Sequence, residues 1–307
     1  MSKDLSYIIP PIDRKLLEAE LKDDFYIRET GKGNHKVYIL RADDAPNVMK
    51  EIGRLRELAF ASAGGGTGKE IDVDDRDYGP KSYQQLIVYA PDEQEIIGGY
   101  RFMDCADLDL SKENLELSTA NYFNFSEDFK NKYLPYTIEL GRSFVQPNYQ
   151  PHINPRKGIY ALDNLWDGLG AIVTQHPHMK YFFGKVTMYT SYNTEARDAV
   201  LSFMQHFFPD NENLVTPKHP ISLKTDLSEF KAQLEGLNFK EGLKLLTQFV
   251  KQRQELIPPL IKNYMQLSPT MKSFGTCVNP DFGEVEETGI LVTLADIYEE
   301  KKARYIQ

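Results

Sequence analysis

The chain of 307 residues has few of the features that mark disulfide-bonded, metal-binding or membrane-spanning proteins. It has two cysteines, Cys105 and Cys277, and neither is flanked by the spacing of a zinc site. No stretch approaches the roughly 18 consecutive apolar residues of a membrane-spanning helix, and the N-terminus lacks the apolar core of a secretory signal. We therefore expect reduced thiols, no metal site and a soluble, cytoplasmic protein.

The chain is also short of positive charge. It contains 36 lysines and arginines against 45 aspartates and glutamates, a formal net charge of −9. This balance argues against non-specific binding to nucleic acid, which requires a basic surface. The sequence has no internal repeat, low-complexity segment or clear linker, so we expect a single domain over 36–307. Residues 1–35 are expected to form an extension packed on it, and about 209–307 a helical C-terminal extension.

The apolar residues alternate between strand and helix spacing, which predicts an α/β protein. A β-meander followed by alternating strands and helices indicates a mixed sheet that is covered by helices on both faces. Pro46 suits the first turn of the first long helix, and Asp44 is the expected N-cap. Helices are predicted at about 46–62, 160–175 and 194–208.

A glycine-rich stretch, AGGGTGK, follows the first long helix and invites comparison with a phosphate-binding loop. That pattern requires glycine at position 63 and serine or threonine at position 70, where the chain has Ala63 and Glu70. The stretch also follows a helix, not a strand. We therefore reject nucleotide binding here and expect a flexible entrance loop.

The acidic run EIDVDDRDYG comes next and has two interpretations. It is either a solvated loop or a set of carboxylates that face a cationic group. That group would be a substrate ammonium or the side chains of Arg56 and Arg101.

Residues 137–147 read as a strand that bends or bulges at Gly141 and ends at Pro147. Glu139 and Arg142 interrupt its apolar run, and charged groups are costly to bury unpaired. One interpretation is a structural ion pair between these two residues. The other is a functional site.

Five motifs, taken in order along the chain, resemble those of GNAT-type N-acyltransferases. The resemblance covers about residues 36–295. It is nearest to the acyl-carrier-protein-dependent branch, which holds the ornithine-lipid and glycine-lipid N-acyltransferases, often labelled hemolysin-like, and the acyl-homoserine-lactone synthases. The motifs are R-x-x-x-F at Arg56 and Phe60, D-x-x-D at Asp74 and Asp77, Arg101 after a Gly-Gly pair, E-x-x-R at Glu139 and Arg142, and the segment LIPPLIKNYMQLSPTMKSFGTCVNPDFG.

The resemblance implies a GNAT-like fold with a C-terminal extension and an enzyme that acylates amines. N-acylation needs a neutral amine, a thioester beside it and hydrogen-bond donors for the oxyanion. We expect Glu139 to act as the base or to position a water, with Arg142 and Ser143 beside it. Backbone N–H groups from Arg142 through Phe144 and Val145 would hold the oxyanion. Arg101 and Arg142 would bind a substrate carboxylate or orient the acidic run.

The segment 154–160 departs from the usual pattern for coenzyme A, R/Q-x-x-G-x-G/A. Arg156, Lys157 and Gly158 remain and suit a phosphate at a helix N-terminus. This favours an acyl group on the phosphopantetheine of acyl carrier protein over acyl-CoA, with no permanently bound cofactor. The expected partners are acyl carrier protein and a small amino-acid acceptor, with peripheral contact at the inner membrane face left open and no nucleic acid.

Two other functions compete with N-acyl transfer. A membrane-active, hemolysin-like protein would be expected to carry a long apolar segment. A catalytically silent acyl-binding module would leave Glu139 dispensable.

Overall fold

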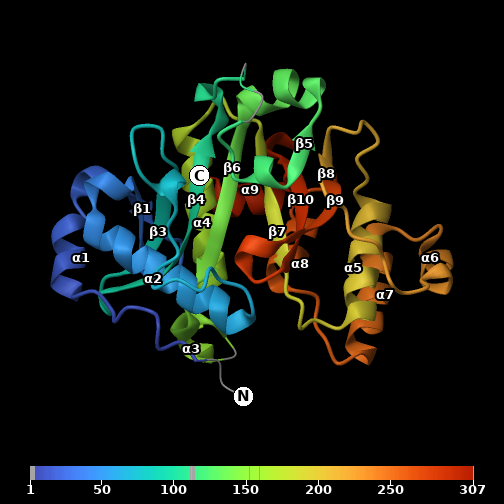
Figure 1. Cartoon of the computed structure of the whole chain (residues 1–307), viewed down its shortest axis with the longest axis horizontal. Helices are drawn as coiled ribbons and strands as arrows, with labels where there is room; N and C mark the ends of the chain where they lie inside the picture. Colours follow the sequence, from blue (N-terminus) through green and yellow to red (C-terminus); the bar gives the residue numbers. More distant parts are fainter. Residues whose placement is uncertain (1–3, 111, 113–114, 152, 159, 307) are drawn as a thin grey trace. The chain divides into compact units, whose positions relative to one another are not determined.

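A computed structural model describes residues 4–306 except 111, 113, 114, 152 and 159. The chain divides into two compact units (Figure 1). The first consists of Met1–Asp104, Ile138–Met179 and Glu299–Gln307, and the second of Cys105–Thr137 and Lys180–Tyr298. The extension over 1–35 and the single domain over 36–307 stay predictions.

The first unit contains an antiparallel sheet in which neighbouring strands pair in chain order. Thr137, the first residue of its last strand, belongs to the second unit. The strands are β1 (Tyr26–Glu29), β2 (Lys36–Leu40), β3 (Gln84–Ala90), β4 (Glu95–Asp104) and β6 (Thr137–Val145). The helices are α1 (Arg14–Glu20), α2 (Pro46–Ala63), α3 (Pro155–Gly158), α4 (Ala161–Gln175) and α9 (Glu299–Tyr305).

Helices α2 and α4 cover opposite faces of this sheet. The glycine Gly168 of α4 packs against the side chain of Leu86, whereas Arg56 of α2 bonds to the side chain of Gln85. Successive residues of a strand point to opposite faces, so the two contacts lie on different sides of β3. Figure 1 shows the two helices at this sheet. This confirms the prediction of helices on both faces for the first unit.

The N-terminus of α2 is capped differently from the prediction. Asp44 belongs to a short 3₁₀ turn, Ala42–Asp44, and the N-cap residue is Ala45, which has no side-chain acceptor. Glu20 of α1 takes this role, because its carboxylate accepts hydrogen bonds from the backbone N–H groups of Asn47 and Val48 at 2.7 and 2.9 Å. The prediction of Asp44 as the cap is therefore wrong.

Strand β6 carries the predicted irregularity. Gly99 of β4 faces Phe144 and Arg101 faces Gly141, so β6 uses one more residue than β4 between these pairs. The extra residue makes a β-bulge, and Arg142 adopts a left-handed conformation with φ 48°. The bend predicted at Gly141 is confirmed, with its positive φ at the next residue.

Close packing of β4 against its neighbours requires glycine. A Cβ atom at Gly98 would lie 2.3 Å from the carbonyl oxygen of Phe144, and one at Gly99 would lie 2.3 Å from that of Leu86. The Gly98–Gly99 pair thus lets β3, β4 and β6 come together just before Arg101.

The second unit contains a three-stranded antiparallel sheet with β10 at its centre. Three aromatic side chains, Phe129, Phe183 and Phe274, form part of its core. The strands of this sheet are β7 (Tyr181–Met188), β9 (Lys272–Asn279) and β10 (Val285–Thr293). The unit also contains a short antiparallel pair, β5 (Phe123–Phe125) and β8 (Val215–Pro217). Its helices are α5 (Thr194–Phe207), α6 (Ser228–Leu234), α7 (Phe239–Gln252) and α8 (Pro259–Met265).

The predicted helices at 46–62, 160–175 and 194–208 correspond to α2, α4 and α5, and the α/β class is confirmed. Within the part of the chain that the structure describes, no helix is both long and apolar enough to span a bilayer.

Candidate active site

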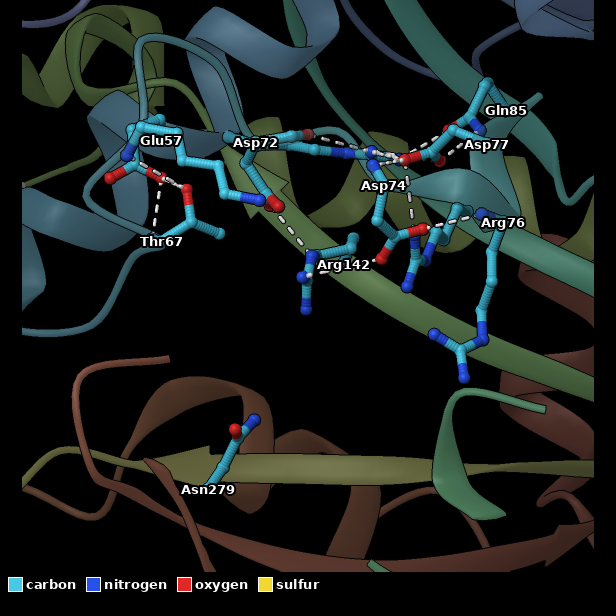
Figure 2. Close-up of polar contacts among 12 residues, drawn as sticks. Glu57, Thr67, Asp72, Asp74, Arg76, Asp77, Gln85, Arg142 and Asn279 are labelled. Carbon is cyan, nitrogen blue, oxygen red and sulfur yellow. Dashed lines mark hydrogen bonds and ion pairs between the residues drawn. The ribbon is translucent and has the colours of Figure 1, made fainter. Parts of the chain in front are cut away.

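A cluster of charged side chains lies in the first unit, where α2, the turn η3 (Asp75–Asp77) and strands β3, β4 and β6 meet (Figure 2). It brings together five of the residues predicted from sequence motifs. We call it the Arg–Asp cluster, and its members are Arg56, Arg101, Arg142, Asp72, Asp74, Asp77 and Gln85.

The innermost part of the cluster joins Arg56, Asp77 and Gln85, all completely buried. Nη1 of Arg56 lies 3.3 Å from Oδ1 of Asp77. Gln85 bridges the pair, because its side-chain oxygen accepts a hydrogen bond from Arg56 and its amide donates to Asp77 at 3.0 Å. Partners of this kind offset the cost of burying charge. Sequence reasoning missed Gln85, a polar residue that directly precedes the apolar run of β3.

Arg101 connects both aspartates of the D-x-x-D motif. Its Nη1 atom lies 2.9 Å from Asp74 and 3.3 Å from Asp77. Burial alone would raise the pKa of Asp74, but the charge and hydrogen bond of Arg101 and the charge of Arg142 lower it to about 2. Asp74 is therefore ionised at neutral pH. The acidic run faces Arg56 and Arg101, as the second interpretation of the sequence expected.

The three-residue spacing of the D-x-x-D motif also has a local cause. The Asp74 side chain accepts a hydrogen bond from the backbone N–H of Arg76, and Asp77 accepts one from the backbone N–H of Asp74. This reciprocal capping box closes the turn η3. The turn thereby aims both carboxylates at the arginines.

Arg142 lies at the solvent-reaching edge of the cluster. Its Nε atom is 2.8 Å from Oδ2 of Asp72, a residue of the acidic run that Arg142 is expected to orient. Its Nη2 atom lies 4.0 Å from Oδ2 of Asp74, and the side chains of Arg142 and Asp74 are 15% and 30% exposed. The left-handed backbone of Arg142 is costly for a residue with a Cβ atom, and such strain is often found at functional sites.

Glu139 is buried on β6 and accepts a hydrogen bond from the hydroxyl group of Tyr83. Tyr83 is also buried, and the guanidinium group of Arg101 lies 5.0 Å from the centre of its ring. Tyr83 thus connects Glu139 to the Arg–Asp cluster. Sequence reasoning missed Tyr83, since nothing in its local pattern distinguishes it from a core aromatic residue.

The other predicted residues of β6 and α2 differ in exposure. Ser143 and Val145 are partly exposed, whereas Phe144 and Phe60 are buried. Their roles in catalysis, and those of Glu139 and Arg142, stay predictions.

The predicted phosphate-binding residues lie apart from the cluster along the sheet. Nζ of Lys157 is 3.7 Å from Glu95, the first residue of β4, and Arg156 is exposed. Glu95 precedes Arg101 by six residues, which corresponds to roughly 20 Å along a strand. Gly158 has no room for a side chain, because a Cβ atom would lie 2.6 Å from the backbone nitrogen of Pro151. Residue 159 lies outside the described residues.

Comparison with known proteins agrees with this geometry. The family model described as acetyltransferase (GNAT) domain matches residues 55–155. A protein named glycine N(alpha)-acyltransferase from Phocaeicola vulgatus is 48% identical over 305 residues, which is 98% of this chain and 92% of the relative. The chain belongs to the GNAT family of N-acyltransferases.

A second relative with the same name, from Bacteroides thetaiotaomicron, is 49% identical to this N-acyltransferase over 301 residues, 98% of the chain and 89% of the relative. No solved structure matches. The matched segment runs from Leu55 in α2 to Pro155 at the start of α3 and so includes the whole Arg–Asp cluster. The predicted GNAT-like fold and N-acyltransferase activity are confirmed, which excludes the catalytically silent module.

Proposed function

We propose that this N-acyltransferase moves a long-chain, 3-hydroxyacyl-type group from acyl carrier protein to the amine of glycine, making an N-acyl amino acid lipid. Glycine is proposed as the acceptor because two relatives are named glycine N(alpha)-acyltransferase. They are 48% and 49% identical to this chain over 98% of its length. The same observation favours glycine over ornithine within the ornithine-lipid and glycine-lipid branch that the motifs resemble.

The edge of the Arg–Asp cluster suits a zwitterionic acceptor. Arg142 and Asp74 offer opposite charges 4.0 Å apart, and both side chains reach solvent. In the proposal Arg142 binds the carboxylate of glycine and Asp74 attracts its ammonium. The pKa of about 2 keeps Asp74 charged for this role but makes it a weak base.

Glu139 is the proposed base. The glycine ammonium must lose a proton, to Glu139 directly or through a water, before its nitrogen attacks the thioester carbonyl. A C–N bond then forms, the C–S bond breaks, and a proton goes to the leaving thiolate. Tyr83 holds the Glu139 carboxylate by its hydrogen bond and so limits its orientation. Ser143 follows Arg142 in the bulged part of β6, four residues after Glu139.

The bulge in β6 supports the proposed oxyanion site. A bulge interrupts the regular ladder, so backbone N–H groups between Arg142 and Val145 are the candidates to bind the developing negative charge. Arg156 and Lys157 would bind the phosphodiester of phosphopantetheine. A carrier-bound donor and a lipid product lead us to propose a cytoplasmic enzyme that acts at the inner face of the membrane.

The test is a matrix of donors and acceptors with the purified enzyme. Long-chain acyl carrier protein, long-chain acyl-CoA and acetyl-CoA are each combined with glycine, ornithine and alanine, and products are identified by mass spectrometry. We expect N-acylglycine from the acyl carrier protein with the highest kcat/KM. An equal kcat/KM for acetyl-CoA would refute acyl carrier protein as the donor, and a preference for ornithine would refute glycine as the acceptor. Release of dye from lipid vesicles tests the hemolysin-like alternative, and we expect none.

A further inference from the structure

The glycine-rich stretch binds an anion that belongs to the chain itself. Glu57 of α2 is completely buried, and its carboxylate accepts hydrogen bonds from the backbone N–H and hydroxyl of Thr67 at 2.8 and 2.7 Å and from the backbone N–H of Gly68 at 2.9 Å (Figure 2). Gly66 and Gly68 have positive φ, which lets consecutive backbone N–H groups converge on one oxygen pair. The stretch expected to be a flexible entrance loop is therefore tied to α2.

The N-terminal segment supplies the fourth donor to this carboxylate. The hydroxyl group of Tyr7 donates to Oε1 of Glu57 at 2.8 Å, although the ring of Tyr7 is partly exposed. Two residues later, the backbone N–H of Ile9 donates to the carbonyl oxygen of Glu70 at 3.3 Å. Burial, the hydrogen bond to Glu57 and its charge raise the pKa of Tyr7 to about 12. Tyr7 therefore remains a donor at neutral pH.

The tied stretch leads directly into the Arg–Asp cluster. The backbone N–H of Asp72 donates to the carbonyl oxygen of Gly53 at 2.9 Å. Gly53 must lack a side chain, because a Cβ atom would lie 2.8 Å from Val73. The Asp72 carboxylate in turn contacts Arg142 at 2.8 Å. Contacts on both sides of residue 70 thus determine where Asp72 meets Arg142.

We propose that Tyr7 and Glu57 are positioning residues for acceptor binding. In this arrangement residues 7–9 are a strap that holds the 67–72 segment through Glu57 and Glu70, and so keeps Asp72 and Arg142 aligned for the acceptor carboxylate. The inference rests on the proposed function, in which Arg142 binds the acceptor. It assigns a role to the glycine-rich motif that phosphate binding does not explain.

The test compares Tyr7→Phe with a matched control, Tyr192→Phe. Tyr192 also donates its hydroxyl hydrogen bond across the fold, to the carbonyl oxygen of Leu256 at 2.8 Å, but in the second unit. Tyr7→Phe should raise the KM for glycine about five- to tenfold, because it removes a hydrogen bond to a charged group. The donor KM and kcat should stay within about twofold of wild type. Tyr192→Phe should leave both KM values unchanged.

Hydrogen exchange of full-length protein gives a second readout that needs no activity. Amides of residues 67–72 should exchange faster in Tyr7→Phe, and faster still in Glu57→Gln, which keeps the shape of the side chain but not its charge. An unchanged KM for glycine, or equal changes in both KM values, would overturn the inference. If the wild-type protein acylates no amino acid, the proposed function fails, but hydrogen exchange still tests the strap. Faster exchange of residues 67–72 in Tyr7→Phe would then support the strap, and unchanged exchange would overturn it.

Discussion

The hydroxyl group of Tyr83 donates a hydrogen bond to the carboxylate of Glu139, and each of the two side chains is 1% exposed. A buried carboxylate with an oriented donor is a common arrangement for an acid or base. Replacing Glu139 with glutamine keeps its size and removes proton acceptance. We expect kcat to fall by about 10²–10⁴-fold, the usual contribution of general base catalysis. Donor KM and melting temperature should remain close to wild type.

The measurement is kcat for Glu139→Gln beside its thermal unfolding curve. Tyr83→Phe provides a control that keeps the Glu139 carboxylate and the ring next to Arg101. A normal kcat with a large drop in melting temperature would assign Glu139 a structural role. The base would then have to be sought elsewhere, first at Asp74 and Asp77, although neighbouring arginines lower the pKa of both carboxylates and so make them weak bases.

Ionised Asp74 stabilises the first unit, and this stabilisation is lost at acidic pH. Its folded-state pKa of about 2 lies below the unfolded-state value of about 3.9. The resulting stabilisation is therefore fully present above about pH 5 and is lost as the pH falls toward 2. Asp74→Asn should lower the free energy of unfolding by about 1–2 kcal/mol at pH 7, after a discount for partial exposure. Urea unfolding from pH 7 to pH 3 should show this difference shrinking, and a constant difference would contradict the assignment.

The sequence predicted much of this site because the relevant patterns are local. Periodicity located α2 and β6, and the motif spacing identified Arg56, Asp74 and Asp77. Their partner Gln85 escaped prediction, since no local pattern shows which side chains the tertiary fold brings to a buried charge. Asp72 lies in the acidic run that was expected to face cationic groups, but its pairing with Arg142 in particular depends on the tertiary fold.

Backbone details were harder to predict for the same reason. Glu20 replaces the local residue Asp44 as the acceptor at the start of α2, because helix α1 packs against α2. The positive φ of β6 lies at Arg142 and not at the neighbouring glycine, Gly141. The sequence predicts the position of the bulge. It does not predict that Arg142 takes the strained conformation, in which Arg142 forms an ion pair with Asp72.

The donor site can be tested by reversing charge at Arg156 and Lys157. The double variant Arg156→Glu, Lys157→Glu should raise the KM for long-chain acyl carrier protein by at least about tenfold, since like charges now face the carrier's phosphodiester. The KM for glycine should not change. Lys132→Glu in the second unit is the control for general charge effects, because Lys132 is an exposed lysine whose ion pair at 2.8 Å is with Asp128, four residues earlier in the chain. An unchanged donor KM in the double variant would refute the site.

Helix α9 offers a test of packing in the first unit. A Cβ atom at Gly170 of α4 would lie 1.7 Å from the backbone carbonyl oxygen of Tyr305, whereas the nearest atoms to one at Gly168 would belong to the flexible side chain of Leu86, the closest at 2.6 Å. Arg28 reinforces the docking by donating to the Tyr305 carbonyl at 2.7 Å. Gly170→Ala should displace α9 and cost about 1–3 kcal/mol despite the better helix propensity of alanine. Gly168→Ala should lower the free energy of unfolding by less than Gly170→Ala does. Chemical unfolding measures this difference between the two variants, and proteolysis of the C-terminus shows whether α9 is displaced.

Arg142 combines a buried ion pair with a strained backbone, so two substitutions at this one position separate the two effects. Arg142→Ala leaves the carboxylate of Asp72 buried without this partner, a loss that typically costs about 3–5 kcal/mol. Arg142→Gly loses the same partner but relieves the left-handed backbone, so it should be more stable than the alanine variant by about 1 kcal/mol. Adding Asp72→Asn to either variant removes the unpaired charge and should restore part of the stability.

The same variants distinguish stability from acceptor binding. Both Arg142→Ala and Arg142→Gly should raise the KM for glycine, because each removes the guanidinium group proposed to bind its carboxylate, and Asp72→Asn should not restore it. Urea unfolding and steady-state kinetics on the same preparations provide the two measurements. Full recovery of the KM in the double variant would mean that Arg142 acts on the acceptor only by supporting Asp72. Equal stability of the alanine and glycine variants would show that the left-handed conformation at residue 142 carries no strain.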